Sequence, residues 1–226
     1  MWETGAWGII RAMTLRSAAA RIVSDKATVA LVAVTVVTSV GHYRTVLPPL
    51  LLNDVLLHLA IPLAIIWLVF RQSPLDYGLR LGNWREGLAW TVGGAALMLV
   101  VALLFVLMGD FQSYYVKYFS VRNPGGGFDA WVVRSGVQMF AWEFLFRGFL
   151  LFALIDTFGP RAILIQAVPF ALAHFGKPEW ETYLSIAGGL LSGWVTYRVR
   201  SFYPAWLIHW ALILALNLFL MEGRGT

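Results

Sequence analysis

The sequence predicts an all-α protein that spans a membrane about seven times. Of its 226 residues, 59% are hydrophobic and 13% are charged, which is about half the charged fraction of an ordinary soluble domain. A soluble fold of this size could not bury so much apolar surface. The apolar residues form continuous runs rather than alternating with polar ones, so we expect helices, not the strands of a barrel, to cross the bilayer.

Composition also limits the chemistry that the chain can carry. The sequence has no cysteine, which excludes thiol catalysis, disulfides and cysteine zinc sites. The net charge is +5, and we attribute this excess to membrane topology rather than to nucleic-acid binding. Because no internal repeat is visible, an inverted-repeat transporter is not indicated.

A basic segment opens the chain, over residues 1–26. Its basic residues are spaced by five: Arg11, Arg16, Arg21 and Lys26. A cleaved signal peptide would carry its apolar run near the start, whereas here four positive charges come before the first long apolar run. We therefore expect an uncleaved interfacial leader, followed by a single membrane domain over residues 27–226.

Seven apolar runs make up the predicted membrane domain. Each is near the roughly 20 residues that a helix needs to cross the hydrocarbon, although the fifth is short. The runs are Ala27–Val40, Leu47–Phe70, Leu88–Met108, Ala130–Ile155, Arg161–Phe175, Thr182–Val199 and Tyr203–Met221. Turn-forming pairs such as Ser73-Pro74 and Gly159-Pro160 separate them, which supports seven distinct helices.

The basic residues predict the orientation of these helices. With the N-terminus inside, ten Lys and Arg fall in inner segments and five in outer segments. Cytoplasmic segments of membrane proteins carry the excess of Lys and Arg. We therefore expect the N-terminus inside and the C-terminus outside.

Ionisable residues inside a bilayer are costly, so each is a candidate for function. Glu143 and Arg147 lie four apart in the fourth run, in the favourable order for a helical ion pair. His174 ends the fifth run, and His209 lies in the seventh. A glutamate with two imidazoles can polarise a water, or hold a metal, and stabilise an oxyanion. The alternative is structural: the ion pair only neutralises itself, and each histidine hydrogen-bonds a backbone carbonyl. We interpret two further histidines as structural: His42 and His58.

Three ordered motifs carry a family resemblance. They are Trp142-Glu143-Phe144-Leu145-Phe146-Arg147-Gly148, then Phe170-Ala171-Leu172-Ala173-His174, then His209. Together they resemble the CAAX-protease and bacteriocin-processing (CPBP, or Abi) family of membrane endopeptidases. The resemblance covers roughly residues 130–217, and the segment from His174 to Glu181 resembles a bacterial branch. It implies a multi-pass protein of the bacterial cytoplasmic membrane that cleaves membrane-associated proteins or peptides.

The resemblance also implies roles for single residues. In the family, the first of two adjacent glutamates and the Phe-x-x-x-His histidine activate a water, while the last motif holds the oxyanion. Carried over to this chain, Glu143 and His174 would handle the water, His209 would hold the oxyanion, and Arg147 would pair with Glu143. This chemistry uses no cofactor. The alternative is a divalent metal such as zinc, held by Glu143, His174 and His209.

The sequence departs from the family pattern at two positions. The first motif glutamate is Trp142, and the hydrogen-bonding residue expected four after His209 is Ile213. Asn217 lies on the same face as His209 but about 12 Å further along the helix. Glu181 is a reserve candidate for the base, since it could fold back over the cavity. Losing one oxyanion donor costs about a hundred- to a thousand-fold in rate.

Two functions therefore stay open for this chain. In one, Glu143 has taken over as the general base of an endopeptidase. In the other, the fold is kept by a non-catalytic membrane binding or immunity factor. The span limits add an objection to a compact site, because they place Glu143 near mid-membrane, His174 toward the outer face and His209 nearer the inner face.

Overall fold

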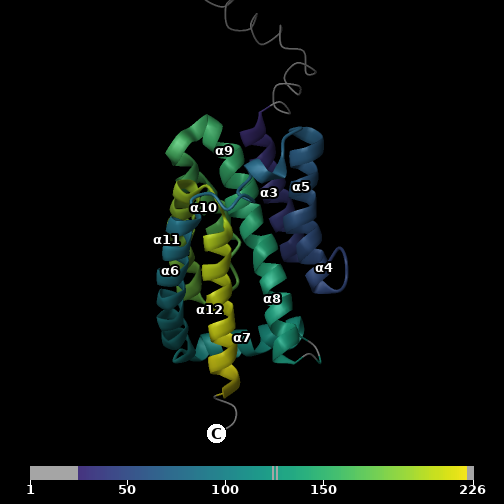
Figure 1. Cartoon of the computed structure of the whole chain (residues 1–226). Helices are drawn as coiled ribbons and strands as arrows, with labels where there is room; N and C mark the ends of the chain where they lie inside the picture. Colours follow the sequence, from purple (N-terminus) through teal and green to yellow (C-terminus); the bar gives the residue numbers. More distant parts are fainter. Residues whose placement is uncertain (1–24, 124, 126, 223–226) are drawn as a thin grey trace, which may run out of the picture.

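The computed structural model describes residues 25–222 of the protein, apart from 124 and 126. The predicted leader over residues 1–26 lies outside the described residues, except for Asp25 and Lys26. The described residues contain helices and turns and no strand, so the all-α prediction is confirmed for this part of the chain. Figure 1 shows a bundle of helices that run roughly along one axis.

The first two predicted spans form two helical passes. Helix α3 is Lys26–Tyr43, and the Asp25 carboxylate accepts hydrogen bonds from the backbone N–H groups of Ala27 and Thr28 at its start. The second pass, Leu50–Val69, alternates α-helix with the wider π-helix. Its pieces are α4 (Leu50–Val55), η1 (Leu56–Ala60), α5 (Ile61–Ala64) and η2 (Ile65–Val69), of which η1 and η2 are π-helical.

The third span is followed by a helix that the sequence analysis did not predict. Helix α6 is Trp84–Val106, with the Asn83 side chain accepting from the Glu86 N–H at its start. Helix α7, Gly109–Arg122, comes next and lies across the end of the bundle where the chain ends (Figure 1). Because α7 is rich in tyrosine and charged residues, its sequence carries no membrane-span signal.

The fourth and fifth predicted spans are two arms joined by a tight turn. The first arm is α8 (Phe128–Glu143), the π-helical η4 (Phe144–Leu150) and α9 (Leu151–Phe158). A 3₁₀ turn, η5 (Gly159–Arg161), reverses the chain, and α10 (Ala162–Leu172) returns. Gly159 has φ +54°, a left-handed conformation that glycine adopts at little cost.

The last two spans are α11 (Glu179–Val199) and α12 (Tyr203–Glu222). Five helical stretches are long and apolar enough to cross a membrane: Lys26–Tyr43, Leu50–Val69, Trp84–Val106, Phe128–Leu172 and Tyr203–Leu220. The fourth stretch has 45 residues and includes the turn at Gly159, so it makes two passes. Helix α11 has 21 residues but is less apolar and is not among these stretches. The protein is thus a multi-pass membrane protein with helices at all seven predicted positions.

The core of the bundle lies around the π-helical segment η4. All seven of its residues, Phe144–Leu150, are buried, and α3, η1 and α10 pack against them. Helix α12 packs against α6 and α8, and α10 packs against α11. At the α6–α12 contact, a Cβ on Gly94 would lie 2.5 Å from the Ile208 side chain, so the helices approach closely there. The outer face of α6 exposes large apolar side chains, as expected for contact with lipid.

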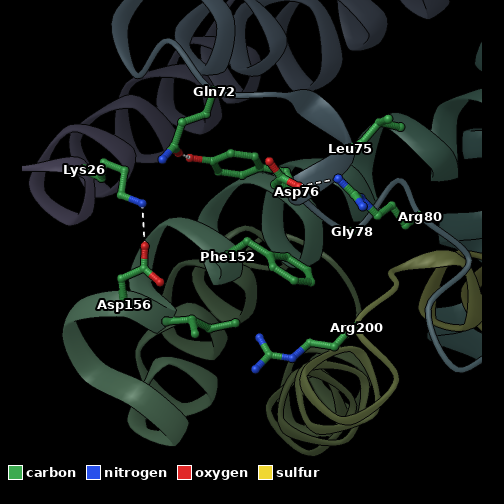
Figure 2. Close-up of a pocket in the computed structure, with 11 residues that line it drawn as sticks. Lys26, Gln72, Leu75, Asp76, Gly78, Arg80, Phe152, Asp156 and Arg200 are labelled. Atoms are coloured by element: carbon green, nitrogen blue, oxygen red, sulfur yellow. Dashed lines mark hydrogen bonds and ion pairs between the residues drawn. The ribbon is translucent and has the colours of Figure 1, made fainter.

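A small cavity lies at the end of the bundle where α3 begins and α9 turns into α10 (Figures 1 and 2). It measures about 400 Å³, and Figure 2 shows the Lys26–Asp156 and Asp76–Arg80 ion pairs among its lining residues. Arg200 also lines it, with φ +61° at the end of α11. Because these ion pairs lie partly or largely in solvent, they add little to stability.

Candidate active site

Two residues from distant parts of the chain form the centre of the candidate site. Glu143 is the last residue of α8, and His209 lies in the second turn of α12. The His209 Nδ1 atom lies 2.6 Å from the Glu143 Oε1 atom, with the carboxylate 1% exposed. The carboxylate accepts the Nδ1 proton, so it fixes the ring's orientation and leaves Nε2 available. His209 lines a cavity, as described below.

Arg147 neutralises the same carboxylate from the other side. Its Nη1 atom lies 3.0 Å from the Glu143 Oε2 atom, and the Arg147 side chain is fully buried. The guanidinium lies over the Phe170 ring, 3.6 Å from its centroid, which adds a cation–π contact. Each oxygen of Glu143 therefore faces a positive or proton-donating neighbour. This arrangement favours a role for Glu143 in holding His209 rather than in taking a proton from water.

His174 lies next to this pair, just past the C-terminal end of α10. Its Nδ1 atom is 2.8 Å from the Phe170 carbonyl oxygen, so Nδ1 donates and Nε2 keeps its lone pair. The Phe170 ring centroid lies 4.6 Å from that of His174 and 6.4 Å from that of His209. The two histidines and Arg147 therefore surround one phenylalanine ring.

The predicted spread of these residues across the membrane is wrong. The expectation took each depth from a residue's place between the limits of its own span. In the structure α10 has 11 residues, whereas the arm from α8 through α9 runs from Phe128 to Phe158. Because the passes are so unequal, positions counted from span limits do not give depth, and Glu143 and His209 come into direct contact.

The two departures from the family pattern both border the same cavity. Trp142 packs its ring against His58, His174 and Phe146, and its indole N–H is buried with no hydrogen-bond partner in the described residues. Ile213 is buried and also lines the cavity. Apolar or aromatic surface therefore occupies both places where the family pattern has a polar side chain.

The two secondary candidates do not join the Glu143–His209 pair. Glu181 accepts a hydrogen bond from the Tyr115 hydroxyl at 2.9 Å, and Lys177 Nζ lies 2.9 Å from its other oxygen. These contacts hold Glu181 away from the role of a free base. Asn217 is buried two turns beyond His209 on α12.

The cavity beside His209 measures about 630 Å³, within the range of small-molecule and peptide side-chain sites. Helices α3, α7, α8 and α12 supply most of its wall, together with the segment that follows α10. Its polar lining includes Tyr118, Gln138 and the partly buried Asp54–Arg122 ion pair. The cavity therefore has the volume of a ligand site and a partly polar wall.

Sequence reasoning missed two groups that face this cavity. His58 lines the cavity and is not a remote core residue, and α7 contributes three tyrosines: Tyr114, Tyr115 and Tyr118. One signal could have indicated the first group. Asp54 and His58 lie four apart in an otherwise apolar run, and two ionisable groups on one face of a span are a functional signal. The tyrosines of α7 carry no comparable pattern.

At the α7 end of the cavity, burial and neighbouring charges shift the pKa values of two ionisable groups, Lys177 and Tyr115. Burial opposes the positive charge of Lys177, but the carboxylate of Glu181 outweighs it and holds the pKa of Lys177 above its ordinary value. Burial raises the pKa of Tyr115 well above its ordinary value, and the nearby Glu181 carboxylate adds to this. At neutral pH this end therefore holds a protonated lysine and neutral phenols.

No group of three or more histidine and acidic side chains in residues 25–222, with 124 and 126 aside, lies close enough to hold a metal ion. The Glu143 Oε1 and His209 Nδ1 atoms are engaged with each other. The predicted zinc alternative with Glu143, His174 and His209 therefore has no preformed ligand set in this structure.

A comparison with family models identifies the candidate site's part of the chain. Residues 125–214 match the family described as "Rce1-like: Type II CAAX prenyl endopeptidase Rce1-like". The matched segment contains all three motifs, from Trp142 to His209, so the resemblance predicted from them is confirmed over this segment. No curated protein and no solved structure matches the chain.

Proposed function

Since residues 125–214 match the type II CAAX prenyl endopeptidase family, we propose that the protein is an intramembrane endopeptidase that cleaves membrane-associated proteins or peptides. The observation that carries this proposal is the 2.6 Å contact between Glu143 and His209. It joins the first and last family motifs, 66 residues apart, at the wall of one cavity. A buried ionic network of this kind costs desolvation energy, which favours a functional reason for keeping it.

In the proposed mechanism, His209 holds the oxyanion. Its Nδ1–H is bonded to Glu143, so a protonated Nε2 presents its hydrogen to the cavity and to the carbonyl oxygen of the substrate. Glu143 stabilises the positive imidazolium and sets its orientation. Arg147 in turn balances the charge of Glu143 in the buried site. Glu143 is thus a positioning residue, not the general base that the sequence suggested.

His174 is the proposed base for the attacking water. Its Nδ1–H is held by the Phe170 carbonyl, so its Nε2 lone pair accepts a proton as the water oxygen bonds to the substrate carbonyl carbon. When the tetrahedral intermediate collapses, the C–N bond breaks and the leaving amine takes this proton. One water is consumed, and the products are a carboxylic acid and an amine.

A cleavage assay on the protein in liposomes tests the proposal. Peptides with a C-terminal membrane anchor are offered in prenylated and unmodified forms, which also tests the substrate class. We expect His174→Gln and His209→Leu, which remove the base and the oxyanion donor, to lower kcat by about a hundred-fold or more. Thr91→Val is the control, because Thr91 is a polar residue of the membrane helix α6 that does not line this cavity. Equal cleavage by all three variants and the parent would refute the mechanism.

A second candidate function is a non-catalytic membrane binding or immunity factor with the same fold. Trp142 and Ile213 favour it, because each puts an apolar group where the family pattern has a polar one. The test is Trp142→Glu, which places a carboxylate next to His174. If the parent does not cleave and Trp142→Glu does, the natural protein is the non-catalytic factor.

A further inference from the structure

His58 is a buried histidine whose position points to the candidate site. It lies in η1, the π-helical segment Leu56–Ala60, and η1 packs against η4, the π-helical segment that carries Arg147. Short π-helical insertions in α-helices are frequent at functional sites. The His58 side chain is 5% exposed and lines the same cavity as His209.

The two ring nitrogens of His58 have different surroundings. Nδ1 is enclosed and has no hydrogen-bond partner among the described residues. Nε2 is not enclosed in this way and faces the cavity beside Gly41, where an added Cβ would lie 3.7 Å from it. The histidine therefore offers one nitrogen to whatever occupies the cavity.

The proton of a neutral His58 is best placed on Nε2. An enclosed N–H without an acceptor is rarer in proteins than an enclosed lone pair without a donor. The Trp142 ring packs against His58, with 5.2 Å between the ring centroids. The unpaired polar atom of Trp142 is its indole N–H, which donates and cannot accept a hydrogen bond from Nδ1. Asp54, one turn earlier, is engaged in its ion pair with Arg122. These neighbours leave Nδ1 as the lone pair and Nε2–H as a donor toward the cavity.

The cavity lacks a donor at a place where the proposed reaction needs one. Ile213 follows His209 by one turn and lines the cavity, but its side chain cannot donate a hydrogen bond. An oxyanion is held far better by two donors than by one, and removing one costs about a hundred- to a thousand-fold in rate. His58 lines this cavity from a different helix, on the second membrane pass.

Building on the proposed endopeptidase function, we propose that His58 is a further catalytic residue and the second oxyanion donor, whose Nε2–H donates to the carbonyl oxygen of the scissile peptide bond. It supplies the donor that Ile213 lacks. No proton passes to or from His58 in this role: it donates one hydrogen bond, which strengthens as the water adds to the carbonyl carbon and the oxygen gains negative charge. The proton from the water goes to His174 and then to the leaving amine, as above.

Two substitutions separate a donor from other roles. His58→Gln keeps an N–H donor, whereas His58→Leu keeps the volume and removes it. We expect His58→Leu to lower kcat by about a hundred-fold or more with KM little changed, and His58→Gln to retain cleavage within about ten-fold of the parent. Adding Ile213→Asn to His58→Leu should restore part of the lost rate, which a misfolded variant would not allow. Thr91→Val, which removes a polar group from α6 away from the cavity, is the control.

Two results would overturn the inference. One is His58→Leu cleaving as fast as the parent, and the other is His58→Gln losing as much as His58→Leu, which would make the ring a base rather than a donor. A binding measurement tests His58 even if the parent does not cleave. A phosphinic peptide, whose tetrahedral oxygens imitate the oxyanion, should bind His58→Leu at least ten-fold more weakly than the parent. The matched amide peptide should bind both alike. If the phosphinic peptide also binds both alike, His58 is not the donor, whatever the fate of the proposed function.

Discussion

Replacing Arg147 with methionine is the sharpest test of how the candidate site is held. Arg147 and Glu143 are 0% and 1% exposed, and their charged atoms lie 3.0 Å apart, so water and salt barely screen them. Removing one partner of such a buried pair leaves an uncompensated charge and costs about 3–5 kcal/mol. For a chain of this length, each kcal/mol lost from the free energy of unfolding lowers the melting temperature by about 2–4 °C. The melting temperature of Arg147→Met should therefore fall by roughly 6–20 °C.

The assay is thermal unfolding in detergent micelles, followed by circular dichroism. Arg147→Met/Glu143→Gln should be far more stable than the sum of the single variants predicts, with a coupling energy of about 2–3 kcal/mol, because it leaves no unpaired buried charge. Arg80→Met is the control: Arg80 forms an ion pair of the same spacing with Asp76, but both side chains are more than half exposed, so its loss should cost less than about 1 kcal/mol. Equal losses for Arg147→Met and Arg80→Met, or additive effects in the double variant, would refute the reasoning.

The remaining predictions concern the ends and contacts of helices. Because the pKa of Tyr115 is raised in the folded state, the protein should lose stability as the pH rises above about 10. Tyr115→Phe should lower the free energy of unfolding by about 1–3 kcal/mol at pH 7, because it removes the hydrogen bond to Glu181. In a series of melting curves at increasing pH, this variant should lose less stability at alkaline pH than the parent. Gly94→Ala should lower the free energy of unfolding by about 1–3 kcal/mol, because the added methyl group overpacks the α6–α12 contact. The neighbouring Gly93→Ala, whose added Cβ meets nothing within 4 Å, should be neutral or stabilising. Equal melting temperatures for the two variants would contradict this. Arg200→Gly should raise the free energy of unfolding by about 0.5–1 kcal/mol, because it relieves a left-handed backbone at a helix end, and a lowered melting temperature would be evidence against that strain.

The membrane passes were predictable because long apolar runs have few alternatives in a chain of this composition. Helix α7 was not, because its tyrosines and charges give neither an apolar run nor a clear apolar face. The turn at Gly159 was visible from its Gly-Pro pair, although hydropathy merges the two arms into one stretch of 45 residues.

The candidate site was predictable in its members but not in their pairing. Sequence spacing placed Glu143 with Arg147, because both lie on one helix and four residues make one turn. It could not place Glu143 with His209, because that contact depends on how two helices 66 residues apart cross. The exposure of His58 to the cavity depends in turn on packing among several passes, which no local pattern records.

The turn at Gly159–Arg161 also bears on how the site is made during synthesis. The arms on either side of it are joined by only three residues, which are too few to form a separate hydrophilic loop between the two arms. We expect the two arms to enter the bilayer as one hairpin, in which His174 lies beside Trp142. His209 arrives on α12, the last helix among the described residues. Since synthesis proceeds from the N-terminus, the Glu143–His209 bond closes last, and a nascent chain that lacks α12 has no complete site.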